Sequence, residues 1–204
     1  MGKIVDGLLA TPMVYDAFQS LIGAPGCHAR FISEMVLPGR GERILDVGCG
    51  VGASIRFLPK EISYVGIDVS APYIETARAK YGERGTFICA DVSSVDTQSL
   101  GSFDRAFSFG VLHHLSDAVA ARAVDLIRRV VRSGGMFVTI DPCYVPNQSA
   151  VAKFLIDNDR GAYVRDQAGF ERLVCGMGKV QSRIFYDLLR IPYTQIVMQV
   201  TIEN

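Results

Sequence analysis

The chain has no tryptophan, only three histidines and no excess of charge, since 21 Lys and Arg balance 21 Asp and Glu over 204 residues. A nucleic-acid-binding face needs a surplus of basic side chains, so this balance argues against a nucleic-acid partner. No apolar run approaches the roughly 20 residues that span a bilayer. Asp6 interrupts the mildly apolar start of the chain, so we expect neither a membrane segment nor a signal peptide.

Cysteine is also sparse, and it is never spaced as a pair. The five cysteines are Cys27, Cys49, Cys89, Cys143 and Cys175. An odd number without a CxxC pair is typical of reduced thiols in a cytoplasmic protein, and it argues against a disulfide framework or a zinc site.

From residue 43 to residue 140, short apolar segments alternate with helical patterns. The segments expected to be strands are Arg43–Val47, Tyr64–Asp68, Thr86–Ala90, Phe103–Phe109 and Met136–Ile140. Helices are expected at Ala53–Leu58, Pro72–Tyr81 and Ala118–Val131. Strands that alternate with helices in this way predict an α/β fold with a doubly wound, mostly parallel sheet.

The two ends of the chain have a different character. Residues 1–40 are predicted to be helical, with a helix start at Thr11-Pro12 and a second helix at about Cys27–Val36. Tyr15 and Phe18 belong either to a lid over a ligand or to the core.

After residue 142 we expect helices near Ser149–Asn158 and Asp166–Gly176, and then a β-hairpin of Val180–Tyr186 and Thr194–Ile202. The chain is thus interpreted as one domain, 1–204. Its parts are a helical lid (1–40), a cofactor-binding core (41–142), and an acceptor-side insert with a closing hairpin (143–204).

A glycine loop follows the first strand directly. Gly48, Gly50 and Gly52 alternate with other residues before the helix, and glycine lets a ligand approach the backbone with no Cβ in the way. The spacing from Gly48 to Ala53 also fits a dinucleotide fingerprint, with Asp68 about 20 residues further on as a ribose-binding acid. The loop alone therefore leaves open a nicotinamide cofactor or S-adenosylmethionine.

Three features outside the loop favour S-adenosylmethionine. Asp46 precedes the loop, where an acid suits a positively charged amino-acid group and repels a pyrophosphate. Asp91, at the end of the third strand, offers an acceptor to an adenine amino group. The strand that begins at Phe103 runs into Phe109-Gly110-Val111-Leu112-His113-His114-Leu115.

These blocks occur in a fixed order: ILDVGCGVG, VGIDVS, CADVSS, FDRAFSFGVLHHL and RSGGMFVTIDP. In this order the region from about Glu42 to Pro142 resembles the class I methyltransferase family, in particular its small-molecule type 11/12 group. The resemblance implies a Rossmann-like, seven-stranded sheet whose last two strands form an antiparallel hairpin. It also implies S-adenosylmethionine as the cofactor and S-adenosylhomocysteine as the product.

The resemblance also implies roles for individual residues around the cofactor. Asp46, Gly48 and Gly50 would line its methionine part, and Phe109 and Gly110 would pass beneath that part. Asp68 would accept hydrogen bonds from the ribose while Val69 packs on adenine. Asp91 would contact the adenine amino group, with Val92 beside it.

The acceptor side has its own candidates. His113 and His114 would face the mouth of the site, and together with Asp141 they are the candidates for a base that takes a proton from the acceptor. We expect no metal role for the histidines, because no Cys, Asp or Glu nearby in the sequence has ligand spacing.

The segment from Asp157 to Arg165 carries more charge than a simple connection needs. Arg160 and Arg165, together with Tyr163 and Tyr15, are the candidates for binding an acceptor, which the arginines would favour as an anion. The alternative is that the arginines form an internal network with nearby acids, namely Asp157, Asp159 or Asp166.

The predicted function is therefore methyl transfer from S-adenosylmethionine to an oxygen or nitrogen of a small molecule. Three alternatives remain open at this point: transfer of another group from the same cofactor, a non-catalytic partner protein of this fold, and a nicotinamide oxidoreductase. The sequence contains nothing that defines the oligomeric state or the acceptor.

Overall fold

The computed structural model describes residues 21–92 and 94–203. The expectations for Thr11-Pro12, Tyr15 and Phe18 lie outside the described residues. Within the described ranges, no helix is long and apolar enough to cross a membrane.

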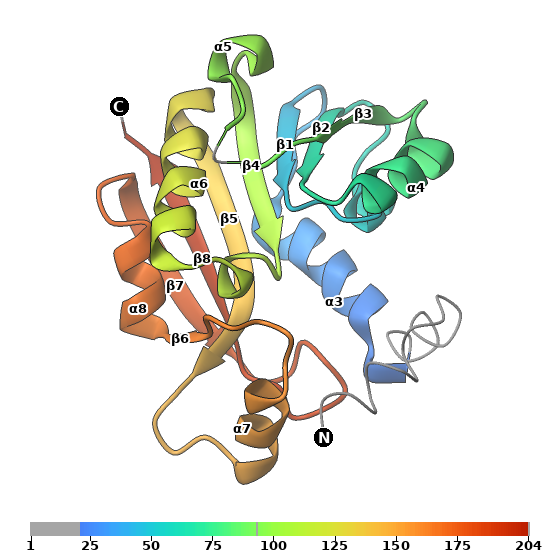
Figure 1. Cartoon of the computed structure of the whole chain (residues 1–204). Helices are drawn as coiled ribbons and strands as arrows, with labels where there is room; N and C mark the ends of the chain where they lie inside the picture. Colours follow the sequence, from blue (N-terminus) through green and yellow to red (C-terminus); the bar gives the residue numbers. More distant parts are fainter. Residues whose placement is uncertain (1–20, 93, 204) are drawn as a thin grey trace.

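A single mixed sheet organises the described part of the chain, with strand order β3-β2-β1-β4-β5-β8-β7 (Figure 1). The strands are β1 (Arg43–Val47), β2 (Ser63–Asp68), β3 (Gly85–Cys89), β4 (Phe103–Phe109), β5 (Val131–Tyr144), β7 (Gly178–Phe185) and β8 (Gln195–Ile202). The first five run parallel, whereas β8 pairs antiparallel with both β5 and β7. The predicted doubly wound sheet with a closing hairpin is thereby confirmed.

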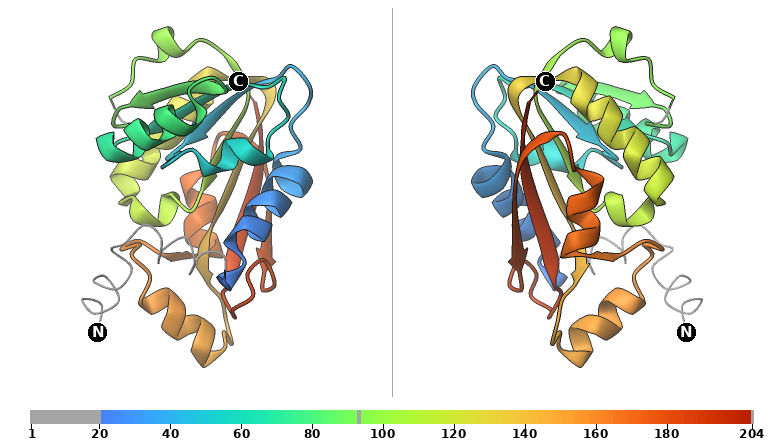
Figure 2. Two further views of the ribbon diagram at one scale, coloured as in Figure 1. Left: turned by 90° about the vertical axis from the view of Figure 1, so that its right-hand side faces the viewer. Right: turned by 90° about the vertical axis from the view of Figure 1, so that its left-hand side faces the viewer.

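Helices cover both faces of the sheet. One face carries α5 (Thr97–Leu100), α6 (Asp117–Val130) and α8 (Gln167–Leu173), and the other carries α3 (Ala24–Arg30), η1 (Phe31–Val36), η2 (Ala53–Phe57) and α4 (Ala71–Tyr81). Figure 2 shows α6 and α8 together on one side of the sheet and α3 on the other. The helix α7 (Ala150–Asp157) lies beyond the carboxyl end of β5.

Alternation along the strands divides the core into two layers. On β5, Phe137 packs with α6 and α8, while Val138 packs with α3 and η1, because successive side chains of a strand point to opposite faces. On α6, the buried residues recur at helical spacing: Ala120, Ala123, Val124, Leu126, Ile127 and Val130.

Several local expectations were wrong in extent or type. The helix expected at Ala53–Leu58 is a 3-10 helix that ends at Phe57. The helix expected at Cys27–Val36 begins earlier, at Ala24, and becomes π-helical from Phe31.

The fifth strand is much longer than expected and runs from Val131 to Tyr144. Gly134 and Gly135 lie between the helix and the strand that were expected here, but in the structure both are part of β5. The strand begins before them because Val131 already pairs with Phe103 on β4, ahead of a shift in register. The two-residue strand β6 (Arg165–Asp166), which pairs with the end of β5, was not expected at all.

A matched pair of Phe→Ala substitutions tests this division between core and surface. Phe137 is fully buried on β5 and Phe154 is 56% exposed on α7. We expect Phe137→Ala to lower the free energy of unfolding by about 3–5 kcal/mol, since it leaves a cavity between two layers. Phe154→Ala should change it by less than about 0.5 kcal/mol. Urea unfolding of both variants measures the difference, and equal effects would contradict the packing described here.

Candidate functional site

Four parallel strands end at the same edge of the sheet, and the loops after them carry most of the candidate residues. The loop after β1 turns directly above the end of β2, because the backbone N–H groups of Gly48 and Cys49 both donate to the Ile67 carbonyl at 2.8 and 3.0 Å. Ligands of open α/β sheets bind at this carboxyl edge.

Gly48 is required by its surroundings. Its φ is +75°, and a Cβ there would lie 2.5 Å from a methyl carbon of Val111. The loop can therefore approach the end of β4 only if no side chain intervenes. At Gly50, with φ +53°, no atom lies within 4 Å of the place where a Cβ would stand, so the loop leaves open space beside its backbone.

Asp68 holds this loop in place. One carboxylate oxygen accepts a hydrogen bond from the Gly50 N–H at 2.9 Å, and the other accepts one from the Ser70 N–H at 2.8 Å. A carboxylate has further lone pairs on both oxygens, so Asp68 retains acceptor capacity toward a ligand. Beside it, Val69 is 72% exposed, as an apolar surface for a flat ring requires.

Asp91 follows the end of β3 and is exposed, and Val92 beside it is half-buried. The pairing of β2 with β3 brings Asp68 opposite Cys89, two residues before Asp91. The acids after β2 and β3 are therefore neighbours at the same edge of the sheet.

Asp46 does not reach the surface of this edge. Its side chain is buried and accepts a hydrogen bond from the Tyr64 hydroxyl at 2.7 Å. Burial raises the pKa of Asp46 to about 7, against the lowering effect of that hydrogen bond. The expected contact with a ligand's amino group stays a prediction, and the structure places this carboxyl beneath the loop.

Phe109 ends β4 and stacks against a side chain of α3. The ring of His28 on α3 stacks on it at 3.6 Å between centroids. Burial lowers the pKa of His28 to about 4, so this imidazole is neutral near pH 7. Sequence reasoning missed His28, because nothing local in the sequence connects α3 with the end of β4.

Gly110 turns the chain after β4 into η3 (Leu112–His114). Its φ is +66° and its N–H donates to the Ile140 carbonyl at 2.8 Å. This turn carries His113 and His114 from β4 toward the end of β5.

Two carboxylates, one on either side, hold the imidazole of His113. Its Nδ1 lies 2.8 Å from Asp141 at the end of β5, and its Nε2 lies 3.3 Å from Asp159. Burial lowers the pKa of His113, but the two hydrogen bonds outweigh that effect and raise it to about 9. The ring is therefore charged at neutral pH, with both nitrogens engaged.

Asp141 is buried and both of its oxygens have partners. The Thr139 hydroxyl donates to one at 2.6 Å, and the His113 backbone N–H donates to the other at 3.1 Å. Asp141 therefore orients His113 rather than facing the surface itself.

Asp159 is the second residue that sequence reasoning missed as part of the site. The Gly161 N–H and the Tyr193 hydroxyl donate to its two oxygens at 2.8 and 2.7 Å. Burial would raise the pKa of Asp159, but hydrogen bonds from His113, Gly161 and Tyr193 hold it well below its usual range. His114, in contrast, is an exposed residue. Burial of part of its ring, together with the charge of His113, lowers the pKa of His114.

Arg165 is embedded in the chain rather than directed into an opening. Its guanidinium donates to the carbonyls of Leu112, Leu115 and Tyr163 at 3.0, 2.8 and 2.8 Å. It also pairs with Asp117 at 2.7 Å, and its side chain is only 11% exposed. This is the internal alternative that the sequence left open, with Asp117 as the partner in place of Asp157, Asp159 or Asp166.

The remaining candidates on this segment are more accessible. Tyr163 is 45% exposed, and its N–H donates to the His113 carbonyl at 2.9 Å. Arg160 is exposed.

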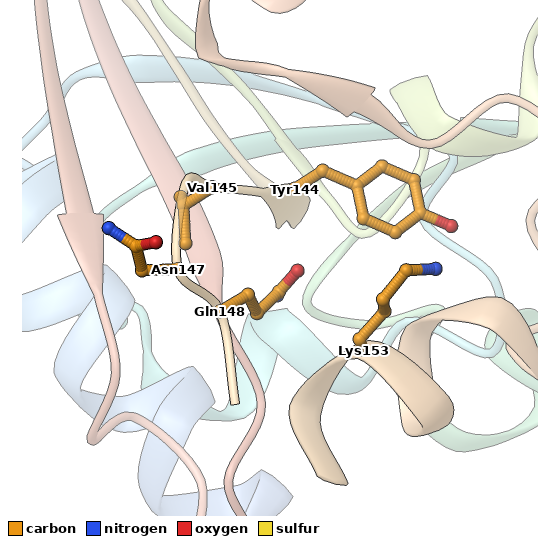
Figure 3. A pocket seen from close by; sticks show the side chains of 5 residues that line it. All are labelled: Tyr144, Val145, Asn147, Gln148 and Lys153. Atoms are coloured by element: carbon orange, nitrogen blue, oxygen red, sulfur yellow. The ribbon is translucent and has the colours of Figure 1, made fainter. Parts of the chain in front are cut away.

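A pocket of about 500 Å³ lies beyond the end of β5, between the loop after that strand and α7 (Figure 3). The residues that line it are Tyr144, Val145, Asn147, Gln148 and Lys153.

Comparison with known proteins agrees with this geometry. Residues 44–135 match a family model described as "Methyltransferase domain". The chain is 31% identical over 160 residues to O-methyltransferase cnsE of Penicillium expansum, which covers 70% of this chain and 56% of that protein. It is 32% identical over 104 residues to a phosphatidylethanolamine N-methyltransferase of Cereibacter sphaeroides, covering 50% and 51%.

Among solved structures, phosphoethanolamine N-methyltransferase 2 of Haemonchus contortus in complex with S-adenosyl-L-methionine shares the fold, with a TM-score of 0.74 and 15% identity. That match covers 99% of this chain and 60% of the other. The chain spans about half the length of the curated relatives it matches. From its strand order, its glycine loop and these matches, the chain belongs to the class I S-adenosylmethionine-dependent methyltransferase family.

Proposed function

We propose that this chain binds S-adenosylmethionine along the carboxyl edge of β1, β2, β3 and β4 and transfers its methyl group to an oxygen or nitrogen of a small molecule. The observation that carries the proposal is the loop at Gly50, which is open beside its backbone and tied to the Asp68 carboxylate. The relatives that are O- and N-methyltransferases support the same chemistry.

The residues of the edge divide among the parts of this cofactor. Asp68 accepts from the ribose hydroxyls, Val69 packs on the adenine, and Asp91 accepts from the adenine amino group, with Val92 beside it. Gly48, Gly50 and Gly110 let the methionine part approach the backbone, and Phe109 lies beneath it. Asp46 is buried next to the glycine loop, and its proposed role is to attract the positively charged amino group of the methionine part.

Little further chemistry is required of the protein. The sulfonium supplies an electrophilic methyl group, so the chain has to align the acceptor and exclude water. Alignment of this kind is worth roughly 7–11 kcal/mol of barrier lowering.

The acceptor is proposed to enter beside His114 at the end of η3 and Tyr163 in the insert, both of which are exposed. His113 and Asp141 act as positioning residues, because both are buried and paired with each other. Arg160 is the proposed contact for an anionic acceptor, whereas the internal contacts of Arg165 assign it to the support of the site. The proposed contact of Tyr15 lies outside the described residues.

Calorimetry on the purified chain tests the cofactor, and mass spectrometry tests the transfer. S-adenosylhomocysteine should bind with a saturable heat, and NAD should give none. Incubation of S-adenosylmethionine with a panel of phenols, carboxylic acids and primary amines should yield a product heavier by one methylene. Saturable NAD binding without any response to the thioether would contradict the proposal.

Asp68→Ala should weaken the binding of S-adenosylhomocysteine. Loss of hydrogen bonds to a charged group costs about 1.5–3 kcal/mol, so we expect the Kd to rise about 10- to 150-fold. Asp125→Ala is the matched control, because Asp125 is an exposed acid on α6 that pairs with Arg129. An unchanged Kd in Asp68→Ala would show that the ribose is held elsewhere.

Arg165→Ala and Arg160→Ala separate support from acceptor binding. Arg165→Ala removes the charged hydrogen bonds to three carbonyls, and we expect it to lower the free energy of unfolding by about 1.5–3 kcal/mol. Arg160→Ala removes an exposed side chain, whose surface interactions are worth at most about 1 kcal/mol, so its effect should stay below about 1 kcal/mol. Thermal unfolding measures both. A larger loss in Arg160→Ala would reverse the assignment.

A further inference from the structure

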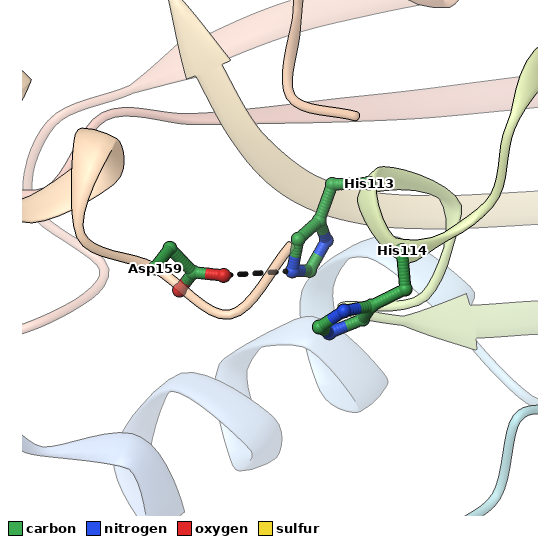
Figure 4. Close-up of side chains that lie close together, drawn as sticks. All are labelled: His113, His114 and Asp159. Atoms are coloured by element: carbon green, nitrogen blue, oxygen red, sulfur yellow. Dashed lines mark ion pairs between the residues drawn. The ribbon is translucent and has the colours of Figure 1, made fainter. Parts of the chain in front are cut away.

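Two consecutive histidines on η3 and an aspartate more than forty residues further along the chain converge on one point. One ligand atom from each of His113, His114 and Asp159 lies within 4.8 Å of the corresponding atoms of the other two. Figure 4 shows the two imidazoles side by side on η3, with Asp159 approaching from the insert and joined to His113. We propose that these three residues form a binding site for a divalent transition-metal ion, with zinc as its best probe.

The choice of ion follows from the donor atoms. Two imidazoles and one carboxylate suit zinc, iron, nickel or copper, whereas magnesium and calcium prefer oxygen ligands alone. Ligand atoms around zinc at 2.0–2.2 Å are roughly 3.3 Å apart. His113 Nε2 and Asp159 already stand at 3.3 Å. His114 is exposed, and its ring centroid lies 4.1 Å from that of His113.

The surroundings of two of the ligands have the form that metal sites require. A ligating histidine donates its other ring N–H to a carboxylate, which fixes its orientation. Here His113 Nδ1 is 2.8 Å from Asp141, and Asp141 is itself held by the Thr139 hydroxyl. A ligating carboxylate is in turn hydrogen-bonded, as Asp159 is by Tyr193.

The backbone of the insert is also shaped around His113. A Cβ at Gly161 would lie 1.9 Å from Cδ2 of the His113 ring. Only glycine therefore allows the loop to pass against the imidazole and bring Asp159 to Nε2.

The charges and protons balance in a simple way. A ligating imidazole is neutral, so the ion replaces the proton on His113 Nε2, and that proton passes to water. His113, His114 and Asp159 would hold the ion with three protein ligands, and the ion would supply a Lewis acid that polarises a hydroxyl bound in a remaining coordination position. The binding itself does not depend on the proposed methyl transfer, because it is measured on the free protein.

Zinc titration of chelator-treated protein against a chromophoric chelator tests the site. We expect one equivalent of zinc to bind, and His114→Ala and Asp159→Asn each to weaken binding at least ~100-fold, since each removes a ligand. Tyr193→Phe, which removes only the hydrogen bond behind Asp159, should weaken it about 10- to 100-fold. Circular dichroism establishes that each variant is folded. If Asp159→Asn or Tyr193→Phe does not fold, zinc binding by His114→Ala is the deciding measurement, because His114 is exposed.

Two controls make the result specific. Asp157→Asn removes a nearby acid that pairs with Lys153 and Tyr144, and it should leave zinc affinity unchanged. Cys89 and Cys175 are exposed thiols, so the double variant Cys89→Ser/Cys175→Ser should also bind zinc normally. Absence of stoichiometric binding would overturn the proposal, and so would wild-type affinity in folded His114→Ala.

Discussion

The strand β5 is hydrogen-bonded on both sides, and the arrangement of the other elements depends on it. It runs parallel to β4 and antiparallel to β8, so it joins the wound half of the sheet to the closing hairpin. Its side chains enter both core layers, with Phe137 on one face and Val138 on the other. It continues past the edge of the parallel strands, and this extension brings Asp141 and Tyr144 into the region of the site.

The two halves of the proposed site, a cofactor side and an acceptor side, are built by different means. On the cofactor side, backbone groups and strand-end acids dominate: the loop after β1 is tied to Ile67 and to Asp68 by hydrogen bonds of 2.8–3.0 Å. These contacts form between neighbouring parallel strands, so the sheet itself holds the loop. On the acceptor side, side chains dominate, and they connect η3, β5 and the insert.

Arg165 and Asp159, both on the insert, make different contacts with η3. Arg165 binds the carbonyls of Leu112 and Leu115 at the two ends of η3, so it holds the turn that carries the histidines. Asp159 binds His113 from the other side. The insert is thereby attached to η3 through the backbone at Leu112 and Leu115 and through the side chain of His113, which limits how far the histidines can move relative to β5.

Local sequence patterns were sufficient for the fold class, and they supply the candidates for the proposed cofactor side. Strand and helix positions follow from apolar periodicity, and β1 and β4 occupy the predicted residues. Gly48 and Gly50 follow β1, Asp68 ends β2 and Asp91 follows β3, so the strand pattern predicts that all four lie at the one edge where parallel strands end. The length of β5 was not predictable. Gly134 is typical of a turn before a strand, and nothing local in the sequence shows that Val131, which precedes it, pairs with Phe103 on β4.

Tertiary structure alone decided the acceptor side. Asp159 meets His113, Arg165 meets Asp117, and His28 stacks on Phe109, and in each pair the partners are far apart in the chain. No periodicity or spacing encodes such contacts, since they depend on how the insert and α3 pack against the finished sheet. The sequence by itself therefore determined the order of strands and helices and the glycine loop after β1, whereas folding determined which side chains meet one another, because only packing brings distant segments within hydrogen-bond distance.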